Sequence, residues 1–238
     1  MTEMTQLAER FQTITSDIAQ HPKPLGQSVD LLAVSKTRSG EEILEVHQLG
    51  QRAFGENYIQ EAVDKIQQLK DYAIEWHFIG PLQSNKSRLA AENFAWVHTI
   101  DRLKIAKRLN EQRPEAMPPL NVCIQVNIDS EPTKSGFLAD QVIEAALEVS
   151  TYPHLTLRGL MAIPQATEDK DQQLQSFTRM KTLFDQVKLT LKESNIDDQK
   201  FDTLSMGMSG DMEAAIQCGA TIVRIGTAIF GPRPAKHQ

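Results

Sequence analysis

The chain alternates between short apolar runs and longer segments with helical spacing, and this alternation continues from residue 31 to residue 225. The apolar runs have the length and residue types of buried strands. They are Leu31–Ser35, Arg52–Gly55, Glu75–Gly80, Trp96–Thr99, Leu120–Asn127, Leu155–Met161, Thr203–Met206 and Thr221–Ile225. Eight strands with helices between them are typical of parallel strands closed into a ring. The sequence therefore predicts an α/β protein, a single (β/α)8 barrel of the TIM type.

The segments between these runs have the features of helices. Apolar side chains recur at helical spacing most clearly at Ile59, Ala62, Val63, Ile66 and Leu69, and at Leu174, Phe177, Met180, Phe184, Val187 and Leu191. The expected N-terminal caps are Ser39 with Glu42, Asn57 with Gln60, and Asp101. Gly50 and Gly219 lie where helix ends favour a left-handed residue.

We expect one domain over residues 1–238, with a helix over about residues 5–20 before the first strand, because Pro22 and Pro24 stop that helix. A chain of 238 residues with 40% apolar content can bury one large core. A doubly wound open sheet is the alternative, since periodicity does not reveal closure. We favour the barrel because both long connections, residues 129–136 and 165–172, follow strands, where a barrel has its functional loops.

Charge and composition exclude several classes of partner. With 25 basic and 31 acidic residues the net charge is −6, which gives no overall attraction to nucleic acid or to an anionic membrane. No window has the apolar length of a membrane span. Cys123 and Cys218 have neither metal-ligand spacing nor a disulfide framework. We therefore expect a cytoplasmic protein that binds no metal, and a monomer, since a barrel of this size can fold alone.

Lys36 is the residue with the clearest chemical potential. It ends the first apolar run, and Ser39 and Glu42 then begin a helix. In an α/β barrel the carboxyl end of a strand is where the chemistry is placed. A lysine there can act as an amine nucleophile toward an aldehyde, although many lysines at strand ends are only solvated.

Two glycine-containing loops near the end of the chain favour a phosphate site. Residues 205–211 follow the seventh run and residues 226–231 follow the eighth. The glycines let backbone N–H groups approach an anion, and the hydroxyls of Ser205, Ser209 and Thr227 add donors. Barrels bind phosphate at these two loops repeatedly. Ordinary turns and helix caps are the alternative for either loop alone.

A reactive lysine and a phosphate site together indicate a ligand that carries both an aldehyde and a phosphate. Pyridoxal 5′-phosphate (PLP) has both groups. A phosphosugar held through a lysine imine is the alternative ligand.

The chain resembles a known family along most of its length, from Leu31 to Gly231. The resemblance rests on residues 33–36 (AVSK), 54–58 (FGENY), 76–86 (WHFIGPLQSNK), 159–161 (GLM), 205–209 (SMGMS) and 223–231 (VRIGTAIFG). These motifs are similar to those of the pyridoxal phosphate homeostasis proteins, the YggS and PROSC family. The resemblance implies a barrel like the N-terminal domain of alanine racemase, a fold-type III PLP protein. It also implies a role in intracellular PLP homeostasis without established catalysis.

The resemblance also assigns site residues. It implies that PLP is bound as a Schiff base on Lys36. Ser209, Gly226 and Thr227 would hold the phosphate. Asn57 would lie close to the ring and Arg224 would face the pyridine nitrogen.

The presence of Arg224 indicates that catalysis is weak. A guanidinium cannot accept a proton, so beside the ring nitrogen it disfavours the pyridinium form that makes PLP a strong electron sink. Two-base racemisation also needs a second proton carrier, and we expect no extra domain after Gly231 to supply one. Tyr58 is the nearest such group by sequence, but a packing role suits it better. An amino-acid racemase is therefore the alternative to a homeostasis protein.

We expect storage and delivery of PLP by reversible capture, with an acceptor's amine releasing the ligand and PLP-dependent apoenzymes as possible recipients. Lys134, in the loop after the fifth run, could act as a gate or second amine, although a solvated loop lysine is the commoner role. His77 and His98 each lack a partner at ligand spacing in the sequence. We therefore expect them to be packing residues rather than metal ligands.

Overall fold

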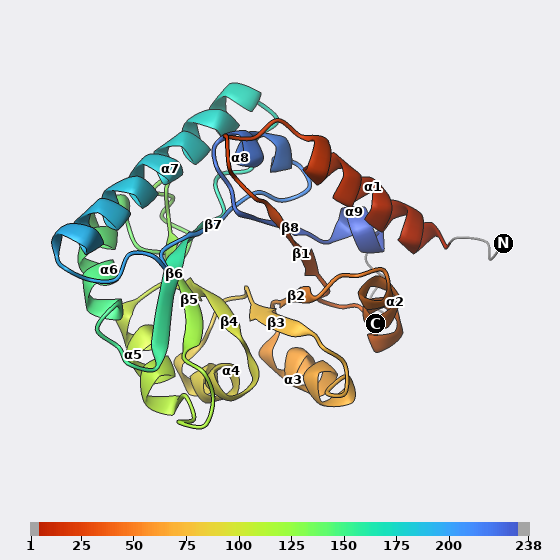
Figure 1. Ribbon diagram of the computed structural model, residues 1–238, viewed down its shortest axis with the longest axis horizontal. Coiled ribbons are helices and arrows are strands. Elements are labelled where there is room, and N and C mark those ends of the chain that lie inside the picture. The colour runs from red at the N-terminus through yellow and green to blue at the C-terminus, as the bar shows by residue number, and fades with distance from the viewer. Residues whose placement is uncertain (1–4, 233–238) are drawn as a thin grey trace.

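The strands close into a parallel ring in the computed structural model (Figure 1), which describes residues 5–232. Within that range the strands are β1 Asp30–Val34, β2 Ala53–Glu56, β3 Glu75–Phe78, β4 Trp96–Ile100, β5 Leu120–Val126, β6 Leu155–Ala162, β7 Thr203–Ser205 and β8 Ile222–Ile225. Each pairs in parallel with the next, and β8 pairs with β1. The predicted barrel is confirmed, and the open sheet was wrong because β1 and β8 pair.

The helices form a ring outside the strands (Figure 1). They are α1 Gln6–Gln20, α2 Gly40–Gln48, α3 Ile59–Gln68, α4 Ser87–Asn93, α5 Leu103–Gln112, α6 Val142–Val149, α7 Lys170–Glu193, α8 Met212–Gln217 and α9 Thr227–Phe230, with short 3-10 turns η1 Ser84–Lys86 and η2 Ala139–Gln141. The expected N-terminal helix is α1. It packs against α9, and Arg10 Nε donates to the Ile229 carbonyl over 2.7 Å.

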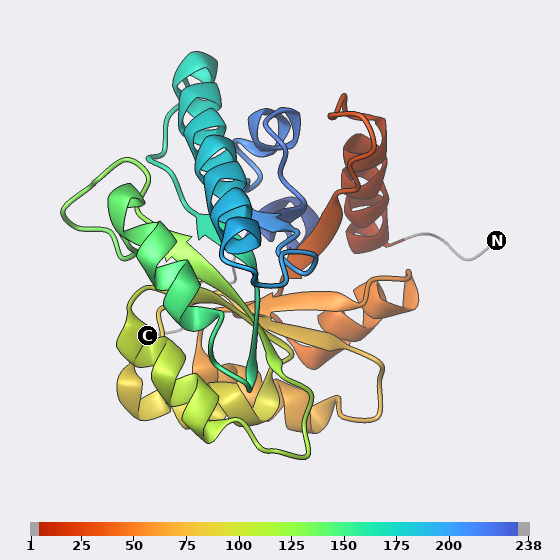
Figure 2. The same cartoon turned by 60° about the vertical axis from the view of Figure 1, so that its left-hand side comes forward.

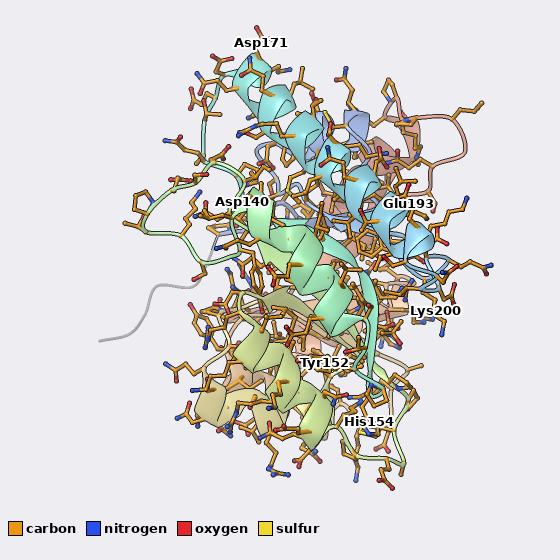
Figure 3. The ribbon with its side chains drawn as sticks, turned by 90° about the vertical axis from the view of Figure 1, so that its left-hand side faces the viewer. Asp140, Tyr152, His154, Asp171, Glu193 and Lys200 are labelled. Carbon is orange, nitrogen blue, oxygen red and sulfur yellow. The ribbon has the colours of Figure 1, made fainter. Side chains whose placement is uncertain are left out.

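Parallel closure gives the barrel two different ends. We call the end formed by the carboxyl ends of the strands the mouth, and the opposite end the floor. After a 60° turn, α7 is seen along the outside of the strands (Figure 2). Asp140 and Asp171 lie at one end of α6 and α7, whereas His154 and Lys200, which precede β6 and β7, lie toward the other end (Figure 3). The first pair marks the mouth side and the second pair the floor side.

The expected helix caps are confirmed in part. Ser39 and Glu42 form a reciprocal capping box at α2. Gly50 and Gly219 have φ values of 108° and 99°, in the region that glycine favours. The expected cap at Asn57 was wrong, because α3 begins one residue later, with Tyr58 as N-cap and no side-chain cap bond.

Asp101 was also wrong as a cap. Helix α5 has Arg102 as its N-cap without a side-chain cap bond. The Asp101 carboxylate instead accepts from Arg102 Nη1 over 2.7 Å. A neighbouring guanidinium therefore competes successfully with the helix end for this carboxylate.

The inside of the barrel is not uniformly apolar. Leu32, Ile79 and Ile222 form one small buried cluster, and Trp96, Cys123 and Met161 form another. Besides these apolar clusters, β3, β4, β7 and β8 each carry a polar side chain inside the barrel, as the two-residue period of a strand allows. These side chains are His77, His98, Ser205 and Arg224, all buried.

His98 is enclosed completely, with 0% of its surface exposed. Burial lowers the pKa of its imidazole well below the ordinary value of 6.5, and nearby His77 and Arg224 lower it further. In the unfolded chain this side chain takes up a proton near pH 6.5, but in the folded protein it stays neutral. Stability is therefore lost as the pH falls below about 6.5.

We predict that replacing His98 by Asn reduces the acid sensitivity of folding. Between pH 6.5 and 5.5 the buried histidine costs the wild-type protein about 1 kcal/mol of unfolding free energy, because only the unfolded state takes up the proton. Urea unfolding of both proteins at pH 7.5, 6.5 and 5.5 measures this difference. Equal losses in the two proteins over this range would contradict the prediction.

Candidate functional site

The predicted site residues gather on one arc of the mouth. Lys36 follows β1, Asn57 follows β2, Ser209 follows β7, and Gly226 and Thr227 follow β8. The ring order places β7, β8, β1 and β2 side by side. The loop after β1 therefore lies between the two glycine-containing loops on one side and Asn57 on the other. Residues 36 and 226 are far apart along the chain, and the pairing of β8 with β1 makes their loops neighbours.

The backbone around Lys36 turns sharply. Thr37, the next residue, has a φ of 63°, which a β-branched residue rarely adopts. Its amide donates to Glu61 Oε1 over 2.6 Å. On the other side of Lys36, the Ser35 amide donates to the Gly55 carbonyl over 2.9 Å. The two neighbours of Lys36 are thus fixed by hydrogen bonds to β2 and α3.

A buried cluster of charges beneath this turn holds both neighbours in place. We call it the Lys65 cluster; it consists of Lys65, Glu56, Glu61 and Ser35. Lys65 Nζ donates to Glu56 Oε1 over 2.9 Å, to Glu61 Oε1 over 2.6 Å and to the Ser35 carbonyl over 2.8 Å. Ser35 Oγ donates to Glu56 Oε1 over 2.6 Å. One ammonium group therefore joins Ser35, which precedes Lys36, to β2 and α3.

Burial of the charged groups of the Lys65 cluster is energetically unfavourable. Desolvation raises the pKa of Glu56, and the charge of Lys65 opposes that rise, as does the Ser35 hydrogen bond. Glu56 Oε2 has no hydrogen-bond partner among residues 5–232. A buried carboxylate of this kind depends on its cation, because an unpaired ion in the interior costs several kcal/mol. Lys65 is therefore the residue on which this part of the mouth depends.

Asn57 offers an unused polar atom at the mouth. Its side-chain Oδ1 is buried and has no partner in the part of the chain that the structure describes. It lines a cavity of about 290 Å³ whose wall also includes Thr99, Lys134 and Ile163. A Cβ on Gly80 would lie 2.1 Å from the Asn57 carbonyl oxygen, so glycine is required there for Asn57 to keep its place. A ligand at the mouth could satisfy this amide.

The loops after β7 and β8 are held together by their backbones. Arg224 N donates to the Gly207 carbonyl over 2.9 Å. Gly207 has a φ of 95°, and a Cβ on it would lie only 2.6 Å from the Cβ of Ala215. A Cβ on Gly226 would lie 3.1 Å from the Val34 carbonyl oxygen, close to the turn of Lys36. Ser209 and Thr227 are both exposed at this edge. These loops therefore present exposed hydroxyl donors, and Gly226 lies close to the end of β1.

Arg224 lies inside the barrel, with 4% of its surface exposed. Its Nη1 donates to Ser205 Oγ and its Nη2 to the Ala162 carbonyl, each over 2.9 Å. Burial lowers the pKa of the guanidinium to about 10, while Asp211 acts in the opposite direction. Arg224 therefore stays charged at neutral pH, and two bonds fix its plane.

Ser205 differs from our expectation of a phosphate donor. Its hydroxyl is fully buried and is engaged by Arg224 Nη1 and, over 2.8 Å, by His98 Nδ1. The Ser205 hydroxyl is thus a hydrogen-bond partner of Arg224. The position of Ser205 within an apolar run could not indicate this, because its partners come from β4 and β8.

Lys134 lies at the mouth, as expected, but it is bound rather than simply solvated. Its Nζ donates to the Ile163 and Pro164 carbonyls over 3.3 and 3.0 Å, and pairs with Glu131 over 2.5 Å. It therefore ties the loop after β5 to the loop after β6. Tyr58 is 53% exposed at the start of α3.

Sequence reasoning missed the Lys65 cluster, although one indication was present. Lys65 falls three residues after Ala62 and four before Leu69, on the apolar side of the predicted helix. A lysine on a buried helix face needs an anion. Glu56, at the end of the second apolar run, was the candidate nearest in the predicted barrel.

We predict that replacing Lys65 by Met lowers the unfolding free energy by about 3 to 5 kcal/mol, because Glu56 loses its buried cation. Urea unfolding measures the loss. Lys70→Met is the matched control, since Lys70 is exposed in the turn that follows α3. Adding Glu56→Gln to Lys65→Met should recover part of the loss. Equal stability of the Lys65 and Lys70 variants would contradict the role given to the cluster.

Comparisons with known proteins agree with this architecture. A family model described as the N-terminal domain of alanine racemase matches residues 8–234. The pyridoxal phosphate homeostasis protein of Pasteurella multocida is 54% identical over 235 residues, covering 98% of each chain. The protein of the same name from Escherichia coli K12 is 49% identical over 236 residues, covering 97% of this chain and 98% of that one.

Solved structures give the same result. PipY of Synechococcus elongatus, solved with PLP bound, matches with a TM-score of 0.81 and 33% identity over 95% of this chain and all of that chain. Its structure without PLP matches with a TM-score of 0.83 and 35% identity at the same coverage. Alanine racemase of Corynebacterium glutamicum, at 16% identity and a TM-score of 0.68, shares the fold; the match covers 98% of this chain and 62% of that chain.

No helix within residues 5–232 is both long and apolar enough to cross a membrane. The identities to the homeostasis proteins extend over nearly the whole chain, and the motifs around Lys36, Asn57 and Arg224 occupy one mouth of a closed barrel. The chain therefore belongs to the pyridoxal phosphate homeostasis protein family, on the fold of the alanine racemase N-terminal domain.

Proposed function

We propose that the protein binds PLP at the mouth of the barrel, as a Schiff base on Lys36, and stores and delivers it as part of intracellular PLP homeostasis. The observation that carries the proposal is the order β7, β8, β1, β2 in the ring, which sets the loop of Lys36 beside the loops of Ser209 and Gly226. The PLP-bound structure of PipY and the names of the relatives support the choice of ligand.

The mouth residues fit PLP by their chemistry. Ser209, Gly226 and Thr227 hold the phosphate with hydroxyl and backbone donors. Asn57 Oδ1, buried without a partner among the described residues, contributes a polar contact near the ring. Lys36 supplies the amine that captures the aldehyde, and the Lys65 cluster keeps its two neighbours in place.

The same residues support a role without strong catalysis. PLP supplies a carbonyl carbon for exchange with amines and, with a protonated ring nitrogen, an electron sink. Arg224 faces the ring nitrogen and remains charged at neutral pH. It therefore donates a hydrogen bond to that nitrogen but does not transfer a proton to it. The likeness to alanine racemase is one of fold, and the racemase alternative therefore has less support.

We place this role in the cytoplasm and assign PLP-dependent apoenzymes as recipients. Cys123 and Cys218 are free thiols, which suits a reducing compartment. The protein acts as a monomer, because a closed barrel leaves no strand edge that needs a partner.

We predict that borohydride reduction of the PLP-treated protein fixes a pyridoxyl group on the peptide that contains Lys36. Peptide mass analysis locates the adduct. Lys36→Ala should abolish it, whereas Lys134→Ala, which removes another amine at the mouth, should retain it. An adduct that persists at the same yield in Lys36→Ala would overturn the assignment of Lys36.

Delivery predicts a second measurable effect. The PLP-loaded protein should activate a PLP-dependent apoenzyme faster than its PLP dissociates spontaneously, because an amine of the acceptor can attack the bound carbonyl carbon directly. Trapping of released PLP by an excess of a carbonyl reagent gives the spontaneous rate. Equal rates would remove delivery from the proposal and leave storage.

A further inference from the structure

We propose that Glu75, His77, His98 and Ser205 form a directional hydrogen-bond relay that runs through the barrel from the floor and positions Arg224 at the mouth. Glu75 and His77 come from β3, His98 from β4 and Ser205 from β7. The inference concerns Arg224 as the group beside the ring of PLP, and in that respect it rests on the proposed function. Nothing in the family motifs or in the names of the relatives assigns these residues a joint role.

The relay is a continuous chain of short contacts. Glu75 Oε1 lies 2.9 Å from His77 Nε2, and His77 Nδ1 lies 2.9 Å from His98 Nε2. His98 Nδ1 lies 2.8 Å from Ser205 Oγ, which accepts from Arg224 Nη1 over 2.9 Å. The two histidines have no partner at ligand spacing along the chain, but in the fold they are partners of each other across β3 and β4.

The charges at the two ends determine the direction of every hydrogen bond between them. Hydrogen bonding to His77 lowers the pKa of Glu75, so the carboxylate is ionised and can only accept. His77 must therefore donate from Nε2, and as a neutral ring it accepts at Nδ1. His98 must then donate from Nε2 and accept at Nδ1. Both rings are neutral, because burial lowers both pKa values.

The directions of the hydrogen bonds at Ser205 follow from the same argument. His98 Nδ1 can only accept, so the single hydroxyl proton of Ser205 is committed to it. The lone pairs of Ser205 then face Arg224, whose guanidinium can only donate. One arrangement of protons satisfies all these contacts: Arg224 donates to Ser205, Ser205 to His98, His98 to His77, and His77 to Glu75. Every hydrogen bond of the relay therefore points the same way, from the buried Arg224 cation to the Glu75 carboxylate at the floor.

The middle of the relay is shielded, and only its floor end reaches solvent. His77 and His98 are 2% and 0% exposed. The ring of His77 stacks on Trp96 with an interplanar angle of 8°, and Arg158 covers Trp96 at 4.5 Å. The side chain of Glu75 is 51% exposed, and Glu75 lines a floor cavity of about 280 Å³ that also contains Asp30 and Arg52. A change at the floor can thus reach Arg224 through bonds that water does not replace.

Without the Glu75 carboxylate, the relay loses the acceptor that holds the proton on His77 Nε2, and only the guanidinium of Arg224 still favours one direction. The opposite tautomer reverses each bond in turn, and the Ser205 proton then points at Arg224 instead of away from it. Arg224 would keep only its bond to the Ala162 carbonyl. Glu75, His77 and His98 are therefore positioning residues, which act on the ligand site through Arg224.

The test measures the tautomers directly in the protein without PLP. Nitrogen-15 NMR of labelled imidazole rings at neutral pH should show both His77 and His98 protonated at Nε2, with Nδ1 as acceptor. Glu75→Leu should destroy this pattern and give a mixture of tautomers at both rings. Asp30→Leu is the matched control, since Asp30 lines the same floor cavity but lies outside the relay. Nδ1 protonation at either ring of the wild-type protein, or an unchanged pattern in Glu75→Leu, would overturn the relay.

A second measurement tests the effect on the mouth. The absorbance maximum of bound PLP should shift in Glu75→Leu and stay unchanged in Asp30→Leu, because only the first variant releases Arg224. A shift of equal size in both variants, or in neither, would overturn the coupling to Arg224. Failure to trap PLP on Lys36 would instead remove the proposed function, and the tautomer pattern of the protein without PLP would still decide whether the relay exists.

Discussion

Pairing of β8 with β1 is the constraint on which the rest of the structure depends. It converts a linear order of strands into a ring, so that loops far apart in the chain, such as those of residues 36 and 226, become neighbours. It also defines an enclosed interior in which polar side chains from β3, β4, β7 and β8 must find one another, because water cannot reach them. The arrangement of the mouth and the relay both follow from this closure.

The two buried polar systems solve different physical problems. In the Lys65 cluster, a single ammonium offsets buried carboxylate charge and holds backbone groups on both sides of Lys36. In the interior of the barrel, neutral rings transmit the orientation imposed by charges at the two ends without carrying charge themselves. The first system fixes where an amine is presented, and the second fixes which way a guanidinium points. Each needs partners from at least three elements.

The fold was predictable because strand and helix periods are local properties of the sequence. All eight apolar runs became strands, with ends that differ by at most two residues. The mouth positions of Lys36, Asn57, Ser209, Gly226 and Thr227 followed from their places after those runs. The partners of Ser205 and the pairing of His77 with His98 did not, since they depend on side chains that meet across the ring. The failed caps show the same limit, because the Asp101 carboxylate pairs with Arg102 and the helix after Asn57 begins one residue later than expected.

The turn at Thr37 has a consequence for how tightly a small molecule can be held. A left-handed threonine costs about 1 to 3 kcal/mol in isolation, and the bond to Glu61 keeps it there before any ligand arrives. The peptide on either side of the amine is thus already ordered. If the proposed capture of an aldehyde takes place there, little of the entropic penalty of loop ordering is left to oppose association.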